Sequence, residues 1–127
     1  MKPIKLNIKT KNENYQILIG KNIVSKASKI FTNNSIEFKK CMLVIDKKVP
    51  KIIILKILKS LKGKEIYKYY FNANEINKNS NSVDKILDYL LKKNFSRDDC
   101  LISVGGGITG DVAGFAASLF KRGLKFI

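Results

Sequence analysis

Hydrophobic and polar residues follow two periodicities along the chain, and these predict its strands and helices. Residues 5–9 and 15–19 alternate apolar and polar side chains around the polar segment KNEN, which predicts an amino-terminal β-hairpin closed by Gly20. Strands that are buried on both faces have continuous apolar or aromatic-rich runs instead. Four such runs follow the hairpin, at residues 41–45, 66–71, 101–104 and 124–127.

The segments between these runs have the three- and four-residue apolar spacing of amphipathic helices, at 23–31, 53–61 and 83–91. Pro50 suits the first turn of the second helix, and Gly63 suits its end. Residues 108–120 are mostly small and apolar, as in a helix packed closely on both sides. This alternation predicts an α/β fold: a Rossmann-like, mostly parallel sheet with helices on both faces and right-handed crossovers, preceded by the hairpin.

Composition narrows the class of protein. A chain of 127 residues with 45% hydrophobic and 28% charged residues fits one globular domain and excludes a disordered or low-complexity protein. The net charge of +15 raises nucleic-acid binding as a hypothesis. However, all cations except Arg97 and Arg122 are lysines, and they are scattered along the chain. Because base readout favours arginine, we interpret the charge as a solvated surface that can steer phosphorylated small molecules.

The two cysteines and the apolar runs bear on the cellular compartment. Cys41 and Cys100 lie on predicted buried strands, so we interpret them as small core residues in a reducing compartment rather than as a disulfide. No apolar run reaches the ~18 residues of a membrane span, and residues 1–8 lack the pattern of a signal peptide. We therefore expect a cytoplasmic protein.

The candidate chemistry lies where the parallel strands end. Asp46 ends the first of these strands, a polar loop (NANEINKNSNS) follows the second, and GGGITGD follows the third. Ligands of such sheets bind beyond the carboxyl ends of the strands, so the three segments should meet in one crevice. Gly105, Gly107 and Gly110 match GxGxxG between a strand and a helix, where glycines let the backbone approach a pyrophosphate.

This glycine segment differs from two common phosphate-binding motifs. The fingerprint of an ordinary dinucleotide fold follows the first strand and precedes an acidic residue by ~20 positions. Here the segment follows the third parallel strand, and Asp111 stands where a P-loop has its lysine. The sequence therefore predicts either a phosphate-binding turn of another lineage or a tight strand-to-helix turn without a ligand.

The stretch LISVGGGITGDVAGFAASLFKRG closely resembles the signature of the 3-dehydroquinate synthase family, in which GGG, two residues, GD, AGFAA and RG recur in this order. The segment NEINKNSNSVDKILDYLLKKNFSRDD resembles that family's GExxK loop, the helix after it and an RDD-like turn. The hairpin ending in IG and the strand ending in VID are also similar. The resemblance implies that residues 1–127 are an incomplete amino-terminal NAD-binding domain, truncated before a helical metal-binding and substrate domain.

The resemblance also implies roles for individual residues. Asp46 matches the acid that binds the adenine-side ribose of NAD, and Glu75 and Lys78 match the nucleotide-contacting acid and lysine of the GExxK loop. Arg122 matches an arginine that holds the substrate's phosphate, in its own subunit or in the neighbouring one. The family loop that wraps the pyrophosphate and the adjacent ribose matches Gly105, Gly106, Gly107, Ile108, Thr109, Gly110 and Asp111.

The chain departs from the family pattern at three positions. Lys48 replaces a small polar residue, Ser80 replaces a leucine, and Asn74 replaces a glycine whose left-handed backbone asparagine tolerates. Without the resemblance, the residues allow simpler interpretations. Glu75 and Lys78 would be a solvated loop pair, Asp111 a first-turn helix residue, and Arg122 a charge at a helix end.

The family reaction converts 3-deoxy-arabino-heptulosonate 7-phosphate to 3-dehydroquinate and phosphate in the shikimate pathway, through transient oxidation by NAD, phosphate elimination, reduction and aldol cyclisation. The resemblance thus implies a homodimeric lyase that uses NAD and a divalent metal, zinc or cobalt, with metal ligands outside this chain and neither nucleic acid nor membrane as partner. We expect the 127-residue chain alone to be inactive. The alternatives are a related sugar-phosphate cyclase, a metal-dependent polyol dehydrogenase or, less favoured, a basic nucleic-acid-binding module.

Overall fold

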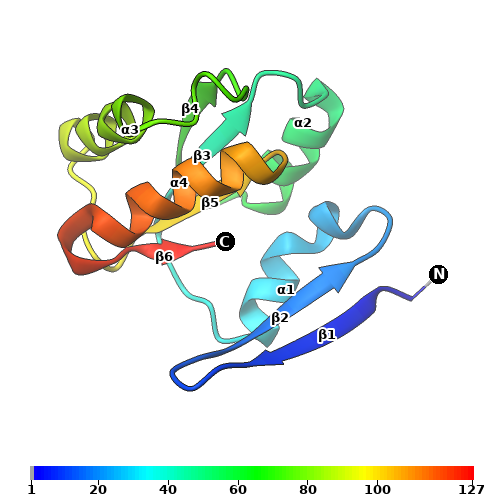
Figure 1. Ribbon diagram of the computed structural model, residues 1–127. Coiled ribbons are helices and arrows are strands. Elements are labelled where there is room, and N and C mark those ends of the chain that lie inside the picture. Colours follow the sequence, from blue (N-terminus) through cyan, green and yellow to red (C-terminus); the bar gives the residue numbers. More distant parts are fainter. Residues whose placement is uncertain (1) are drawn as a thin grey trace.

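The computed structural model describes residues 2–127 and is built around a four-stranded parallel sheet (Figure 1). The strands lie in the order β4–β3–β5–β6, so β3 is central and pairs with both β4 and β5. Their bounds are Lys40–Asp46 for β3, Glu65–Phe71 for β4, Cys100–Val104 for β5 and Lys125–Phe126 for β6. Burial of β3 on both faces explains its unbroken apolar run, as predicted.

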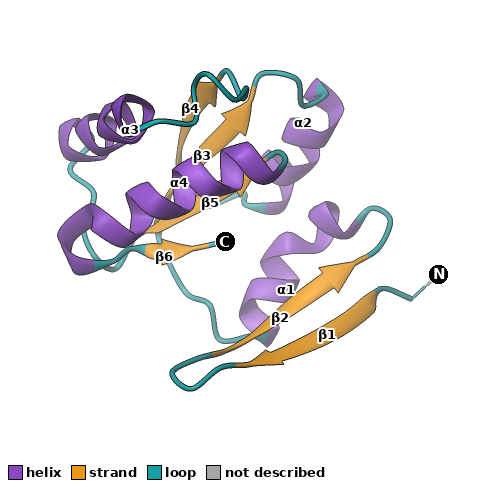
Figure 2. Cartoon of the chain, in the orientation of Figure 1, coloured by secondary structure: helices purple, strands orange, loops and turns teal. Residues whose placement is uncertain are grey.

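Helices cover both faces of this sheet (Figure 2). The bounds are Ala27–Asn33 for α1, Lys51–Ser60 for α2, Ser80–Lys92 for α3 and Gly107–Leu119 for α4. Side chains of a strand point alternately to opposite faces. Met42 and Val44 accordingly join the core under α3 and α4, whereas Cys41, Leu43 and Ile45 join the core under α2. The predicted α/β class with helices on both faces is therefore confirmed.

Two predicted helices differ in detail from the structure. The segment predicted at 23–31 begins as a short 3-10 helix, η1 (Ile23–Lys26), before α1. The last helix ends at Leu119 because the backbone then turns left-handed, with φ of 44° at Lys121 and 69° at Arg122. Non-glycine residues rarely adopt this conformation, so the end of α4 is a strained turn.

The predicted hairpin is present but separate from the parallel sheet. Strands β1 (Ile4–Lys9) and β2 (Asn14–Ile19) form a two-stranded antiparallel sheet that lies beside α1 (Figure 1). Its turn is closed by Thr10, whose hydroxyl oxygen accepts a hydrogen bond from the Glu13 N–H at 2.9 Å. Within residues 2–127, no hairpin side chain belongs to either core.

The interpretation of the cysteines as core residues is confirmed. Cys41 and Cys100 are cross-strand partners on β3 and β5, and both are fully buried free thiols. Burial raises the pKa of Cys41 to about 11 and that of Cys100 to about 12, because the thiolate would lose its hydration. No helix in the described part of the chain is long and apolar enough to cross a membrane.

Candidate functional site

The carboxyl ends of β3 and β5 meet at one edge of the sheet. Asp46 is the last residue of β3, and its Oδ1 accepts a hydrogen bond from the Lys48 N–H at 3.0 Å. Gly105 follows β5 directly, and a Cβ added there would lie 2.9 Å from the Asp46 Cβ and 2.8 Å from Thr109 Oγ1. Glycine is therefore needed at this position because α4 begins so close to the end of β3.

The other glycines of the segment leave the start of α4 open. The helix begins at Gly107, and among the described residues no side chain caps it. The first amide groups of a helix have no partner within it and carry part of the helix dipole's positive end. A Cβ added at Gly106, Gly107 or Gly110 would meet nothing within 4 Å. The segment thus combines free backbone donors with open space, which is what a bound pyrophosphate requires.

Thr109 adds an unpartnered polar group to the same turn. Its side chain is fully buried, and among the described residues Oγ1 is the one buried side-chain oxygen or nitrogen without a hydrogen-bond partner. A buried hydroxyl normally has a partner. The Thr109 hydroxyl lies against Gly105 in the glycine turn, and the residues packed around it do not explain why a buried polar group has no partner there.

The polar loop after β4 is joined to the glycine segment by an ion pair. Lys78 Nζ lies 3.0 Å from Asp111 Oδ2, and this hydrogen bond raises the pKa of Lys78. Asparagines shape the loop: the Asn77 N–H donates to Asn74 Oδ1 at 2.8 Å, and Asn77 Nδ2 donates to the Asn72 carbonyl at 2.9 Å. Asn74 does not have a positive φ, so the left-handed backbone that asparagine tolerates is not used here, and its side chain shapes the turn instead.

Two predicted site residues are placed differently from this cluster. Glu75 is exposed on the same loop, and within residues 2–127 its carboxylate forms no hydrogen bond or ion pair. Arg122 lies beyond the other end of α4, a helix of 13 residues and therefore about 20 Å long. In its own chain Arg122 does not reach the crevice. Asp111 is the fifth residue of α4, so its alternative reading as a first-turn residue is wrong.

An open cavity of about 380 Å³ lies beside Asp46 and the glycine turn. Its apolar wall is formed by Val49, Ile53 and Val104, which sequence reasoning missed. The sequence contains a signal for two of these residues, because Val104 is the last residue of β5 and Val49 follows the end of β3 by three residues. An apolar wall next to a carboxylate suits a nucleoside, whose flat base is apolar on its faces and whose ribose carries hydroxyl donors.

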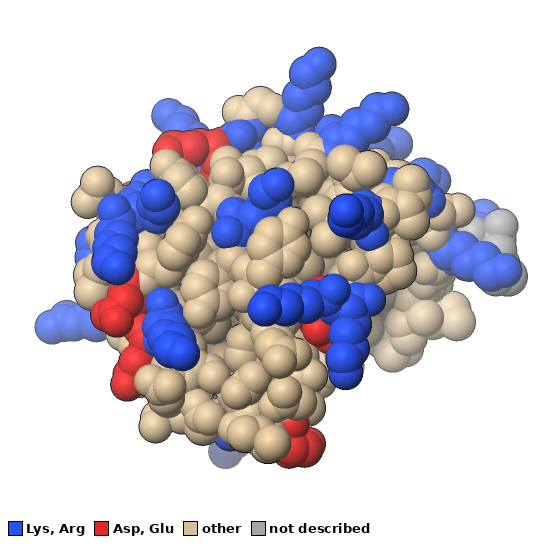
Figure 3. Space-filling model, turned by 90° about the horizontal axis from the view of Figure 1, so that it is seen from above, with Lys and Arg blue, Asp and Glu red and all other residues tan. Residues whose placement is uncertain are grey.

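Charge is spread widely around this site. Figure 3 shows one face of the molecule, on which the blue lysine and arginine side chains are dispersed among uncharged surface.

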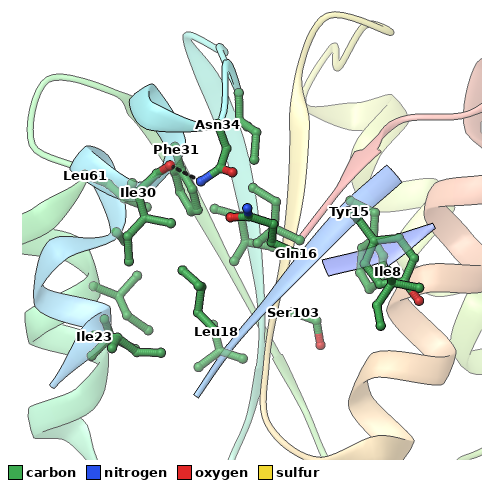
Figure 4. Close-up of a pocket in the computed structure, with 18 of the residues that line it drawn as sticks. Ile8, Tyr15, Gln16, Leu18, Ile23, Ile30, Phe31, Asn34, Leu61 and Ser103 are labelled. Carbon is green, nitrogen blue, oxygen red and sulfur yellow. Dashed lines mark hydrogen bonds between the residues drawn. The ribbon is translucent and has the colours of Figure 1, made fainter. Parts of the chain in front are cut away.

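A second and larger cavity, of about 1160 Å³, lies between the hairpin, α1 and the carboxyl ends of β5 and β6 (Figure 4). Neither Asp46 nor the Lys78–Asp111 pair lines it.

The sequence of this chain is similar to those of known proteins. Residues 68–127 match the family described as 3-dehydroquinate synthase N-terminal. The chain is 56% identical over 124 residues to the 3-dehydroquinate synthase of Pelagibacter ubique (strain HTCC1062), covering 98% of this chain and 34% of that protein. It is 33% identical to the 3-dehydroquinate synthase of Streptococcus sanguinis (strain SK36), covering 98% and 35%. The chain thus spans about a third of the length of these relatives.

Solved structures show the same fold. A 2-deoxy-scyllo-inosose synthase complexed with carbaglucose-6-phosphate, NAD+ and Co2+ superposes with a TM-score of 0.85 at 22% identity, over 97% of this chain and 34% of that one. ValA, a 2-epi-5-epi-valiolone synthase from Streptomyces hygroscopicus subsp. jinggangensis 5008 with NAD+ and Zn2+ bound, gives 0.63 at 25% identity, over 70% and 26%.

The fold and the matched sequences are consistent with each other. The parallel sheet, the separate hairpin and the strand-end crevice define it as an amino-terminal domain of the sugar-phosphate cyclase fold. The glycine segment that carried the resemblance lies inside the matched residues 68–127. Among these proteins, the matched residues 68–127 and the 56% identity to the Pelagibacter enzyme relate the chain to the amino-terminal part of 3-dehydroquinate synthases.

Proposed function

We propose that this chain is the NAD-binding part of a 3-dehydroquinate synthase, a cytoplasmic lyase that converts 3-deoxy-arabino-heptulosonate 7-phosphate to 3-dehydroquinate and phosphate in the shikimate pathway. One observation carries the proposal. Asp46, the glycine turn and the Lys78–Asp111 pair, which come from three separate segments, converge at one edge of the sheet. Ligands of parallel α/β sheets bind at this edge.

The residues of the crevice fit a dinucleotide. Asp46 Oδ1 accepts the Lys48 N–H, and within the described chain Oδ2 makes no hydrogen bond, which leaves it for a ribose hydroxyl. The backbone amides at the start of α4 would hold the pyrophosphate, and Lys78 adds a positive charge beside them. When bound, NAD would supply reversible acceptance of a hydride from the substrate. The chain's own residues bind the nucleotide and fix its orientation.

The metal that the family uses does not fit the residues present. The chain has no histidine, and the described residues contain no group of three or more metal-ligating side chains. The described residues of this chain would therefore not hold such a metal on their own. Arg122 lies beyond the far end of α4, whose 13 residues span about 20 Å, so any role on the substrate's phosphate would lie away from its own glycine turn.

Titration of the chain with NAD by calorimetry tests the nucleotide site. Asp46→Ala should weaken binding about tenfold to a hundredfold, because a charged hydrogen bond to a ligand contributes roughly 1.5–3 kcal/mol. The matched control is Asp84→Ala, which removes an exposed carboxylate from α3, outside the crevice, and should bind normally. Absence of saturable NAD binding by the wild-type chain, or equal loss in both variants, would overturn the proposed site.

A chimera tests the reaction. Residues 1–127 would replace the aligned part of the Pelagibacter enzyme, which the chain matches at 56% identity. Phosphate release from the heptulosonate phosphate should occur with the chimera and be lost with its Asp46→Ala form. The isolated chain should bind NAD without turnover. A chimera that folds and binds NAD but releases no phosphate would show that the nucleotide site is correct and that the proposed reaction is wrong.

A further inference from the structure

The cavity beside Asp46 is lined by a charged side chain to which the proposed function assigns no role. Of the described residues that line this cavity, two are charged, Asp46 and Lys48. Lys48 is also the position at which a lysine replaces the small polar residue of the family pattern. A change of charge inside a nucleotide crevice bears on which nucleotide the crevice accepts.

The backbone fixes Lys48 close to the Asp46 carboxylate. The Lys48 N–H donates to Asp46 Oδ1 at 3.0 Å, and the Val49 N–H donates to the Asp46 carbonyl at 3.0 Å, so the turn folds back on its first residue. Because an N–Cα bond is about 1.5 Å long, the Lys48 Cα lies within about 4.5 Å of Asp46 Oδ1. A group that binds Asp46 is therefore within reach of the flexible four-carbon lysine side chain.

The ammonium group of Lys48 is not engaged by another part of the protein. The residue is exposed, and within residues 2–127 its Nζ takes part in no hydrogen bond or ion pair. Asp46 Oδ1 accepts the backbone N–H of Lys48 instead. Lys78, by contrast, is paired with Asp111 at 3.0 Å. Lys48 can therefore bind an anionic ligand without first breaking a contact within the chain.

The charge of Lys48 matters at one end of a dinucleotide. In dinucleotide folds an acid that binds the 2′-hydroxyl of the adenine-side ribose selects NAD, whereas a nearby cation accommodates the 2′-phosphate of NADP. NAD and NADP differ in this phosphate alone. An acid by itself would repel the phosphate, but here a lysine lies beside the acid and offsets the repulsion. The net charge of +15 also favours the more anionic of the two ligands.

We propose that Lys48 makes this site accept NADP as well as NAD, by contacting the 2′-phosphate of the adenine-side ribose. The inference rests on the proposed function, which puts that ribose at Asp46. The two side chains then act on different ligands. The Asp46 carboxylate binds the ribose hydroxyls of NAD, and the Lys48 ammonium group binds the extra phosphate of NADP as a point charge.

Calorimetric titration of the 127-residue chain with NAD and with NADP tests this assignment. The wild-type dissociation constants for the two dinucleotides should agree within about tenfold. Lys48→Ala should weaken NADP binding about tenfold and change NAD binding less than about twofold, because a charged contact to the phosphate is lost. Lys47→Ala is the matched control. It removes the same charge from the adjacent exposed residue, which does not line the cavity, and should leave the ratio of the two constants unchanged.

Two further variants separate charge from repulsion. Lys48→Arg keeps the positive charge and should retain NADP binding. Asp46→Ala should weaken NAD binding, as proposed above, but should leave NADP binding unchanged or tighter, because the carboxylate that repels the phosphate is gone. Far-UV circular dichroism of each variant checks that the fold is retained.

The possible failures are distinguishable. Binding of NAD without binding of NADP would overturn the inference and leave the proposed nucleotide site intact. Equal loss of both dinucleotides in Lys48→Ala would also overturn it, because the lysine would then contact a part that the two ligands share. So would equal effects of Lys47→Ala and Lys48→Ala, which would follow overall charge and not position. A chain that binds neither dinucleotide would overturn the proposed nucleotide site and this inference with it.

Discussion

Replacement of Gly105 by alanine tests the close approach on which the crevice depends. The added Cβ would lie 2.8 Å from Thr109 Oγ1, 2.9 Å from the Asp46 Cβ and 3.0 Å from the Thr109 Cβ. The two Cβ atoms are fixed to backbone, so α4 must move away from β3 by a few tenths of an ångström. Overpacking of this kind costs about 1–3 kcal/mol. Loss of backbone freedom in the unfolded chain offsets up to about 1 kcal/mol of this cost.

Gly110→Ala is the matched control for this prediction. Gly110 lies inside α4, and a Cβ there would meet nothing within 4 Å. Alanine should therefore stabilise the helix by about 0.5–1 kcal/mol. The same chemical change, made five residues apart, is expected to move stability in opposite directions. The expected difference of roughly 2 kcal/mol combines the overpacking at Gly105 with the gain in helix propensity at Gly110.

Urea unfolding followed by far-UV circular dichroism measures both variants. The midpoint for Gly105→Ala should fall and that for Gly110→Ala should rise, with the slope of the transition unchanged. Both variants should bind NAD more weakly, the first because the strand ends separate and the second because the methyl group enters the open side of the turn. The reasoning is refuted if Gly105→Ala is as stable as Gly110→Ala, since the packing distances would then carry no cost.

Two further predictions concern the titratable side chains. In the folded chain Cys41 has a pKa of about 11 and Cys100 a pKa of about 12, whereas unfolded thiols ionise near 9. The free energy of unfolding should therefore fall as the pH rises from 9 to 12. Below pH 9 the two thiols should have no effect on stability, because they are protonated in both states. Urea midpoints measured across this range check it, and a Cys41→Ala/Cys100→Ala chain with an equally steep decline would contradict it. Lys78→Met should leave the urea midpoint nearly unchanged, because its pair with Asp111 is exposed, and should weaken NAD binding severalfold by calorimetry. Normal NAD binding by Lys78→Met would remove this lysine from the site.

The parallel sheet could be predicted from the sequence because the residues of β3 indicate a strand in the middle of a sheet. Its unbroken apolar run requires burial on both faces, and the alternation of Met42 and Leu43 between the two cores follows from strand geometry. The position of Asp46 beside the glycine turn could also be predicted, since the carboxyl ends of neighbouring parallel strands share one edge.

Contacts between distant segments could not be predicted in the same way. The pattern of the hairpin predicts an apolar face, but only the tertiary arrangement shows that this face is left uncovered. The ion pair from Lys78 to Asp111 depends on a loop shaped by Asn74 and Asn77, whose side-chain hydrogen bonds have no periodic signal. The left-handed backbone at Lys121 and Arg122 likewise has no signal in the residue types, because lysine and arginine rarely adopt it.

The pair between Lys78 and Asp111 has a consequence for how salt affects ligand binding. Lys78 follows β4 and Asp111 follows β5, so the pair joins the segments after the two strands that flank β3, whose last residue is Asp46. The phosphates of a nucleotide bound beside Asp46 would compete with Asp111 for the Lys78 ammonium group. Salt would then act on binding in two opposing ways, because it screens the attraction of the basic surface and also weakens the Lys78–Asp111 pair.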